Sequence, residues 1–177
     1  HERKRLGTKF KLPSPNTITQ LLMTYKNYSK RKAEAEATDL TDLEAQIVAK
    51  ADNDDPEFID TLLHVVSVYT YTKRYKEAQA LVDRAFRLYE SLKESVSATT
   101  TAALWRHVGL FQHLSHELEK AEISYRNSLD TETDAKLRSE TRVKLAGVLV
   151  DSGDPDKAEI ELTEALEEDP ESSDVYM

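Results

Sequence analysis

Small residues recur in this sequence at positions that lie on one face of a helix, and the recurrence happens three times. In each copy an alanine is followed four residues later by a larger side chain, and three residues after that by another small one. Because steps of three and four return to the same side of a helix, each copy predicts a helix packed closely against a partner. A repeat of this kind favours an array over a single layered domain. The copies, spaced by 43 and 37 residues, are Ala78–Val82–Ala85, Ala121–Tyr125–Ser128 and Ala158–Leu162–Ala165.

A partner helix is expected before each copy. The middle copy is preceded by the only tryptophan, Trp105, with Val108 and Gly109 after it. Glycine costs a helix interior about 1 kcal/mol relative to alanine, so we attribute Gly109 to the close approach of the next helix at Ala121. Trp105, one turn earlier, is expected to fill the space toward neighbouring helices. The matching segments of the other copies are Leu62-x-x-Val65-Val66-x-x-Tyr69 and Arg142-x-x-Leu145-Ala146-x-x-Leu149.

The composition favours an all-α fold. Glycine and proline are scarce, at 4 and 5 of 177 residues, and no alternating strand pattern of useful length occurs. We predict six helices in the repeats and one or two more near the N-terminus. Gly153 is expected to end the helix before it in the left-handed conformation. A capping side chain stands before a proline suited to a first helical turn at Asp55-Pro56, Asp154-Pro155 and Asp169-Pro170.

These residues resemble the tetratricopeptide repeat (TPR) family, whose pattern is Trp-x2-Leu-Gly-x2-Tyr, then Ala-x3-Phe, then Pro. The resemblance covers residues 58–170 and implies an antiparallel helix-pair solenoid with a right-handed superhelix. The polar insertions at 93–101 and 130–134 lengthen the spacing, as in the kinesin-light-chain-type variant that the chain resembles. The middle copy matches the pattern best, with Trp105, Val108, Gly109, Ala121 and Tyr125.

The expected organisation has a basic arm at 1–16, a helical segment at 17–57 and the repeats at 58–177. Because the chain begins at His1 and stops where another repeat could start, we expect a fragment or a processed product and an array truncated at its C-terminus. The three repeats are expected at about 58–93, 99–131 and 137–170.

Two interpretations are open for residues 17–57. They form either a degenerate fourth repeat or helices that cap the array. The fourth-repeat interpretation rests on the spacing of Glu44, Val48, Ala51 and Pro56, which fits the second helix of a copy.

No catalytic motif is present, and we predict a protein that is not an enzyme. Cysteine is absent, which excludes disulfides, a thiolate nucleophile and cysteine zinc sites. His113 and His116 are spaced for a metal, but His107 is turned away from them, so ordinary histidines are favoured over a metal site. No calcium, phosphate-binding or dinucleotide loop occurs. We expect no cofactor and no small-molecule substrate.

The family resemblance implies that a partner lies in a concave groove lined by the first helix of each pair. Arg106 is the only strong base at the groove positions, so the basic clamp of the chaperone-binding members is absent. A mostly apolar groove suits a helix or a hydrophobic segment. The alternative is that some of these residues pack against the next repeat. The groove positions are Leu63, Ser67, Thr70, Arg106, Leu110, His113, Val143, Gly147 and Val150.

Charge is divided along the chain. Residues 1–32 carry nine Lys or Arg and one acid, whereas the whole chain has a formal net charge of −9. The arm is a solvated tail, a binder of nucleic acid or acidic lipid through phosphates, or a segment docked on a protein. The acidic body disfavours nucleic acid. The expected contact residues of the arm are Arg3, Lys4, Arg5, Lys9, Phe10 and Lys11.

The sequence therefore predicts a non-catalytic protein–protein interaction module: a scaffold, an adaptor, an assembly factor or a structural subunit of a larger complex. The alternative is an RNA- or anionic-membrane-associated protein that uses the basic arm. Measurements of salt-dependent binding before and after deletion of residues 1–16 distinguish the two hypotheses. We expect an intracellular protein, in the cytoplasm or an organellar matrix, that is not an integral membrane protein. No apolar run approaches the roughly 18 residues of a membrane span.

Overall fold

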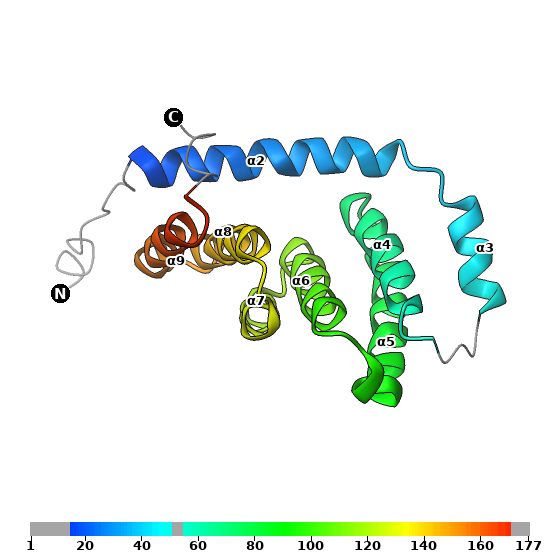
Figure 1. Cartoon of the computed structure of the whole chain (residues 1–177). Helices are drawn as coiled ribbons and strands as arrows, with labels where there is room; N and C mark the ends of the chain where they lie inside the picture. The colour runs from blue at the N-terminus through cyan, green and yellow to red at the C-terminus, as the bar shows by residue number, and fades with distance from the viewer. Residues whose placement is uncertain (1–14, 51–54, 171–177) are drawn as a thin grey trace, which may run out of the picture.

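The computed structural model describes residues 15–50 and 55–170, and within these ranges the chain is helical with no strand (Figure 1). The predicted all-α fold is confirmed. A short 3-10 helix, Lys93–Ser95, follows the fourth of eight α-helices. In chain order these are α2 (Pro15–Glu36), α3 (Thr41–Ala49), α4 (Phe58–Tyr71), α5 (Tyr75–Leu92), α6 (Ala98–Leu114), α7 (Leu118–Thr131), α8 (Ala135–Asp151) and α9 (Pro155–Glu168).

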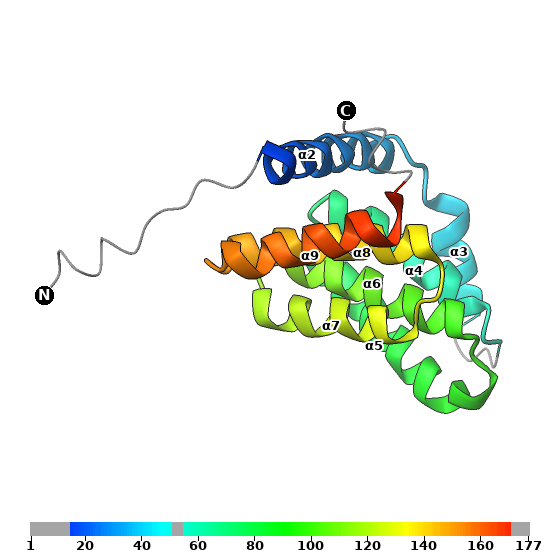
Figure 2. The same cartoon turned by 60° about the vertical axis from the view of Figure 1, so that its left-hand side comes forward.

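Six of the helices form three side-by-side pairs. α4 packs with α5, α6 with α7 and α8 with α9, and successive pairs meet through α4–α6 and α7–α8 (Figures 1 and 2). Ala78, Ala121 and Ala158, the residues that defined the three copies in the sequence, are all buried. A methyl group at each of these positions lets the second helix of a pair lie close to its neighbours.

The three pairs share one turn geometry. The residue at the bend has a positive φ each time, 62° at Lys73, 66° at His116 and 82° at Gly153, and these positions have the 43- and 37-residue spacing of the alanines. The predicted left-handed conformation of Gly153 is confirmed. In each turn the following N–H donates at 2.8 Å to a carbonyl five residues earlier, which satisfies a helix end. These bonds run from Arg74 to Tyr69, from Glu117 to Gln112 and from Asp154 to Leu149.

Gly109 makes room for a side chain. A Cβ placed on Gly109 would lie 2.8 Å from Cδ1 and 2.9 Å from Cε1 of Tyr125, whose ring is fully buried. The sequence interpretation placed this approach at Ala121 and is corrected to Tyr125, one turn later on α7, because an aromatic ring reaches across the helix interface. Trp105 contacts Phe86 of α5, with ring centroids 5.2 Å apart. The tryptophan thus fills the space toward the preceding pair, as predicted.

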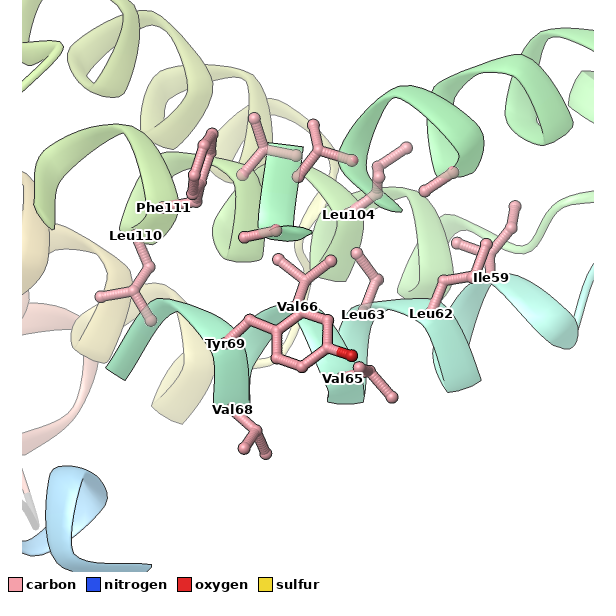
Figure 3. Packing of buried hydrophobic residues seen from close by; sticks show 14 of the residues in the cluster. Ile59, Leu62, Leu63, Val65, Val66, Val68, Tyr69, Leu104, Leu110 and Phe111 are labelled. Atoms are coloured by element: carbon pink, nitrogen blue, oxygen red, sulfur yellow. The ribbon is translucent and has the colours of Figure 1, made fainter. Parts of the chain in front are cut away.

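The largest part of the core surrounds α4 (Figure 3). Ten of its fourteen residues are buried. Leu63 and Val66 point toward Leu104 of α6, whereas Val65 and Val68 point away from it (Figure 3). A helix that is apolar on several sides must be enclosed by neighbours, and α4 is enclosed by α2, α3, α5 and α6.

Helix capping matches the sequence prediction in α9 and differs elsewhere. An Asp154 carboxylate oxygen accepts from the Lys157 N–H at 3.2 Å, and Pro155 is the first helical residue. Pro56 instead lies in a turn before α4, because the Asp55 carboxylate accepts the Glu57 N–H at 3.0 Å and closes that turn. Asp169 is the residue that ends α9, and the chain beyond Pro170, where a further helix was expected to begin, lies outside the described residues.

In the third helix pair, a network of charged side chains occupies the place that Trp105 has in the second pair. Arg142, 37 residues after Trp105, donates to Glu161 at 2.9 Å and to Glu168 at 3.0 Å. The same guanidinium lies 2.9 Å from Glu164. All three carboxylates belong to α9, so these ion pairs join α8 to α9. Charges that are mostly shielded from water must be paired in this way to be tolerated.

α2 and α3 are arranged differently from the three pairs. α2 packs on α4, α8 and α9, and α3 packs on α4. Figures 1 and 2 show α2 as a long helix lying across one side of the pairs rather than alongside α3. Of the residues that suggested a fourth copy, Val48 is 78% exposed, and Ala51 lies outside the described residues.

Candidate interaction surface

α2 covers one face of the helix pairs. It runs from α8 and α9 at one end to α4 at the other (Figure 1). We call the surfaces of α4, α6 and α8 that are turned toward it the inner face. Tyr28 of α2 packs on Tyr71 of α4, with ring centroids 5.8 Å apart and planes tilted by 53°, and Ala35 of α2 is buried. A helix of this chain therefore already lies on the inner face.

Basic side chains occupy matching positions on the inner face. His64 of α4, His107 of α6 and Lys144 of α8 have the 43- and 37-residue spacing of the repeats. Arg31 of α2 is close enough to act electrostatically on both His107 and Lys144. We call these four residues the basic row. Each comes from a different helix, so only the folded chain brings them together.

The basic row is poorly neutralised. Burial, and after it the charges of Arg106 and of the rest of the row, lower the pKa of His107 to about 3. Burial and the charges of Arg106 and Arg31 lower the pKa of Lys144 to about 8, against the opposing effect of Glu140. His107 Nδ1 is buried without a hydrogen-bond partner among the described residues. His107 is therefore neutral near pH 7, and Lys144 is the member of the row that keeps a positive charge in a partly buried position.

The two ionisable side chains at predicted groove positions are engaged within the fold. Arg106 donates to Glu132 at 3.3 Å. His113 Nε2 lies 2.7 Å from an Asp151 carboxylate oxygen, which links α6 to α8. A Cβ on Gly147 would lie 3.5 Å from His113 Cε1, an ordinary contact. Arg106 and His113 are held by these partners, so their use by an external ligand would require exchange of an existing contact.

Three of the seven other predicted groove residues face the interior. Leu63, Thr70 and Leu110 are buried, and the Thr70 hydroxyl donates to its own helix at the Val66 carbonyl, 2.7 Å away. Ser67 and Val143 are half-buried, and Val150 is 37% exposed. Among the apolar groove residues, Val150 is thus the one best placed to touch another molecule. The predicted arm residues Arg3, Lys4, Arg5, Lys9, Phe10 and Lys11 lie outside the described residues.

A polar hollow of about 300 Å³ lies where α2 leads into α3, beside α4. Its internal contacts are structural. The Tyr69 hydroxyl donates to Glu44 of α3 at 2.7 Å, and the Arg74 guanidinium lies 4.1 Å from the centre of the Tyr69 ring. Burial and the Glu44 carboxylate raise the pKa of Tyr69 to about 12. These contacts hold α3 on α4.

The basic row is the feature that the sequence interpretation missed. That interpretation considered His107 as a metal ligand and did not compare it with residues in the other copies. The signal was the repeat spacing, which places His64, His107 and Lys144 in one register, although two residue types share the position. Within the described ranges, no group of three or more His, Asp or Glu side chains is placed to hold a metal ion.

No protein-family model matches the chain, and no curated protein matches it. Among the described helices, none has both the length and the apolar character needed to cross a bilayer. The functional conclusion therefore comes from the geometry of the chain itself.

Proposed function

We propose that this chain is a non-catalytic protein–protein interaction module, built as a TPR-like solenoid of antiparallel helix pairs with a right-handed superhelix. The observation that carries the proposal is the position of α2 against α4, α8 and α9. A surface that receives one helix of its own chain has the shape to receive a helix of another. The module would act as a scaffold, an adaptor, an assembly factor or a structural subunit of a larger complex.

The repeated turn supports the solenoid part of the proposal. Lys73, His116 and Gly153 bend the chain with the same hand and the same hydrogen bond. Repeat proteins stack equivalent units whose faces are buried only by their neighbours. The third copy departs from the TPR pattern, since Arg142 stands in the tryptophan place and Ala146 in the glycine place.

The partner would bind as a helix laid across the first helices of the pairs. Such recognition depends on apolar contacts that repeat along one side of the bound helix. Val150 of α8 is an exposed apolar residue at a predicted groove position, and Ile160 of α9 is an exposed apolar residue outside the predicted groove. The two residues therefore offer a matched comparison between surfaces.

The test begins with affinity purification of the full chain and mass spectrometry to identify a partner. The affinity of that partner is then measured for Val150→Glu and for Ile160→Glu. We expect a loss of about tenfold or more for Val150→Glu, because a buried unpaired carboxylate costs more than about 1.4 kcal/mol, and little change for Ile160→Glu. Circular dichroism verifies that both variants fold. If Ile160→Glu abolishes binding while Val150→Glu leaves it intact, the binding surface is not the inner face.

A further inference from the structure

We propose that the basic arm docks on the outer side of α9 in its own chain. Six α9 residues line a shallow hollow on this side of the helix, and we call them the α9 face. The contact pairs bases of the arm with carboxylates of the α9 face and covers an exposed apolar side chain among them. It does not involve the inner face. The α9 face consists of Asp156, Glu159, Ile160, Thr163, Glu164 and Glu167.

The α9 face has an apolar residue that the neighbouring helices leave exposed. α9 lies at the end of the array (Figures 1 and 2) and packs on α8 and, to a smaller extent, on α2. Neither helix covers Ile160, which is 58% exposed. Ile123, 37 residues earlier on α7, is 60% exposed. Covering either side chain removes apolar surface from water, which is favourable. Both helices thus offer an apolar contact at the same place, and their charges distinguish them.

The acids of the α9 face lack the base that α7 has at the matching place. On α7, a Glu122 carboxylate oxygen lies 3.4 Å from Arg126. The residues 37 positions later on α9 are Glu159 and Thr163. The acid is therefore kept and the base is lost. Over its whole length α9 has six acids and one base, whereas α7 has three acids and two bases.

Three carboxylates of the α9 face are available to bases from elsewhere. Lys157, the one base of α9, lies 3.5 Å from Asp154 at the start of the helix. Glu164 is paired with Arg142 at 2.9 Å. Among the described residues, no ion pair is made by the remaining acids of the face, which are Asp156, Glu159 and Glu167. Complementary charge guides the choice of partner across an interface, so the α9 face favours a basic segment with apolar side chains.

The basic arm has this composition. The part of it that precedes α2, residues 1–14, contains five Lys or Arg and one acid. Phe10 and Leu12 alternate with Lys9 and Lys11. Apolar and basic side chains thus stand next to one another in the arm, as Ile160 stands among acids on the α9 face. The arm is complementary to the face in both charge and apolar character.

The fold attaches the arm close to the α9 face. α2 begins at Pro15, and its N-terminal end lies at the α8 and α9 end of the array (Figure 1). Fourteen extended residues span up to about 46–50 Å, whereas a helix of the length of α9 is about 21 Å long. The arm therefore reaches the whole face. Exposed ion pairs are individually weak, but a short tether gives an effective concentration of about millimolar, at which weak contacts suffice.

A spin label on the arm tests the contact in the full chain. Because the sequence has no cysteine, Thr8→Cys provides a single labelling site and leaves every charge of the arm in place. A paramagnetic label weakens the NMR signals of nearby amides. We expect a strong loss of amide signal at Ile160 and Thr163 and little loss at Ile123 on α7. Unchanged signals at Ile160 and Thr163 overturn the proposal.

Charge variants of the labelled chain separate docking from the mere nearness of a tethered segment. Asp156→Asn combined with Glu167→Gln removes two exposed acids of the α9 face. The matched control is Glu119→Gln combined with Asp130→Asn, which removes the two exposed acids 37 residues earlier on α7. We expect the α9 variant to regain most of the lost signal at Thr163 and the α7 variant to regain none. A loss as large in the α9 variant as in the parent chain overturns the proposal.

The apolar part of the contact has its own matched pair. Ile160→Ser and Ile123→Ser remove side chains of similar exposure at matching places on α9 and α7. We expect the signal loss at Thr163 to become smaller in Ile160→Ser and to stay the same in Ile123→Ser. A full loss in Ile160→Ser would show that the arm does not cover this side chain, and would overturn that part of the proposal.

A mixed sample identifies which chain supplies the arm. Spin-labelled chain of natural isotopic composition is combined with unlabelled chain enriched in nitrogen-15, so that only contacts between two molecules weaken the observed signals. We expect the signals of Ile160 and Thr163 to keep their full intensity in this mixture. A loss as large as in the singly labelled sample would mean that the arm docks on a second copy, and would overturn docking within one chain.

Discussion

The Ser128 hydroxyl donates a hydrogen bond to the Ala102 carbonyl at 2.8 Å, which joins α7 to α6. In the third pair the two positions exchange roles. The Ser139 hydroxyl of α8 donates to the Ala165 carbonyl of α9, also at 2.8 Å, and each residue lies 37 after its counterpart. The same inter-helix bond is therefore made from opposite sides, which shows that the two pairs share one packing geometry at the level of single atoms.

Exchanging the serine within the second pair should preserve this bond. Ser128→Ala leaves the Ala102 carbonyl without its donor and is expected to cost about 1 kcal/mol of unfolding free energy. Adding Ala102→Ser reproduces the arrangement of the third pair and should recover most of that loss. Urea denaturation of the two single variants and the double variant gives the coupling energy. Strict additivity would show that the two positions are not interchangeable.

Gly109 and Gly147 should respond oppositely to alanine. A new Cβ at Gly109 meets the buried Tyr125 ring at 2.8 Å, whereas at Gly147 the nearest atom, His113 Cε1, is 3.5 Å away. Both changes gain the same helix propensity, about 1 kcal/mol, so the difference between them isolates the clash. We expect Gly109→Ala to be less stable than Gly147→Ala by about 1–3 kcal/mol in urea denaturation. Equal stabilities would mean that the Tyr125 ring moves without cost.

The turns carry conformational strain at two of their three bends. Lys73 and His116 are exposed and adopt positive φ without being glycine. Lys73→Gly and His116→Gly are each expected to raise the free energy of unfolding by up to about 1 kcal/mol, because glycine adopts this conformation freely. Gly153→Ala should lower it by a similar amount. Thermal melts of the three variants test this prediction. A loss of stability on introducing glycine at both Lys73 and His116 would contradict it.

His107 should make the fold sensitive to acid. Its folded pKa of about 3 lies below the unfolded value of 6.5, mainly because of burial and then because of Arg106, Lys144, His64 and Arg31. The unfolded chain therefore binds a proton more readily, so the stability contribution is full above about pH 6.5 and falls as the pH drops toward about 3. By about pH 4 the loss from this group is about 1–3 kcal/mol.

The measurement compares the unfolding free energy of the parent chain and of His107→Gln between about pH 7 and about pH 4. The glutamine variant cannot take up this proton, so its stability should fall less steeply over that interval. Parallel curves for the two proteins would show that His107 is protonated equally in the folded and unfolded chains.

The helices were predictable because their signals are local. The spacing of Ala78, Ala121 and Ala158 located the second helices, and the left-handed end at Gly153 follows from the backbone freedom of one residue. Pro56 shows the limit of local rules, since the Asp55 side chain closes a turn there and delays α4 to Phe58. A local hydrogen bond from a side chain to the backbone competes with helix initiation. The Asp-Pro sequence is the same in both cases, so it does not show which of the two forms.

The candidate surface was less predictable because its residues are joined only by packing. Leu63 and Leu110 occupy groove positions by their register, yet both are buried in the apolar core around α4. Their burial depends on the rotation of each helix pair relative to the next pair. The sequence of one pair alone does not define that rotation. The basic row was visible in the repeat spacing, but the approach of Arg31 was not, because like charges give no sequence signal of proximity.

The sequence by itself determined the helical class, the three paired copies and the bends between them, since each depends on interactions among residues a few positions apart. Only the tertiary structure decided that Tyr125 rather than Ala121 lies against Gly109, that Arg142 gathers three carboxylates of α9, and that α2 covers the inner face. The physical reason is that helix periodicity defines which side of a helix is apolar. The partner of that side is chosen by shape, reach and charge among residues distant in the chain.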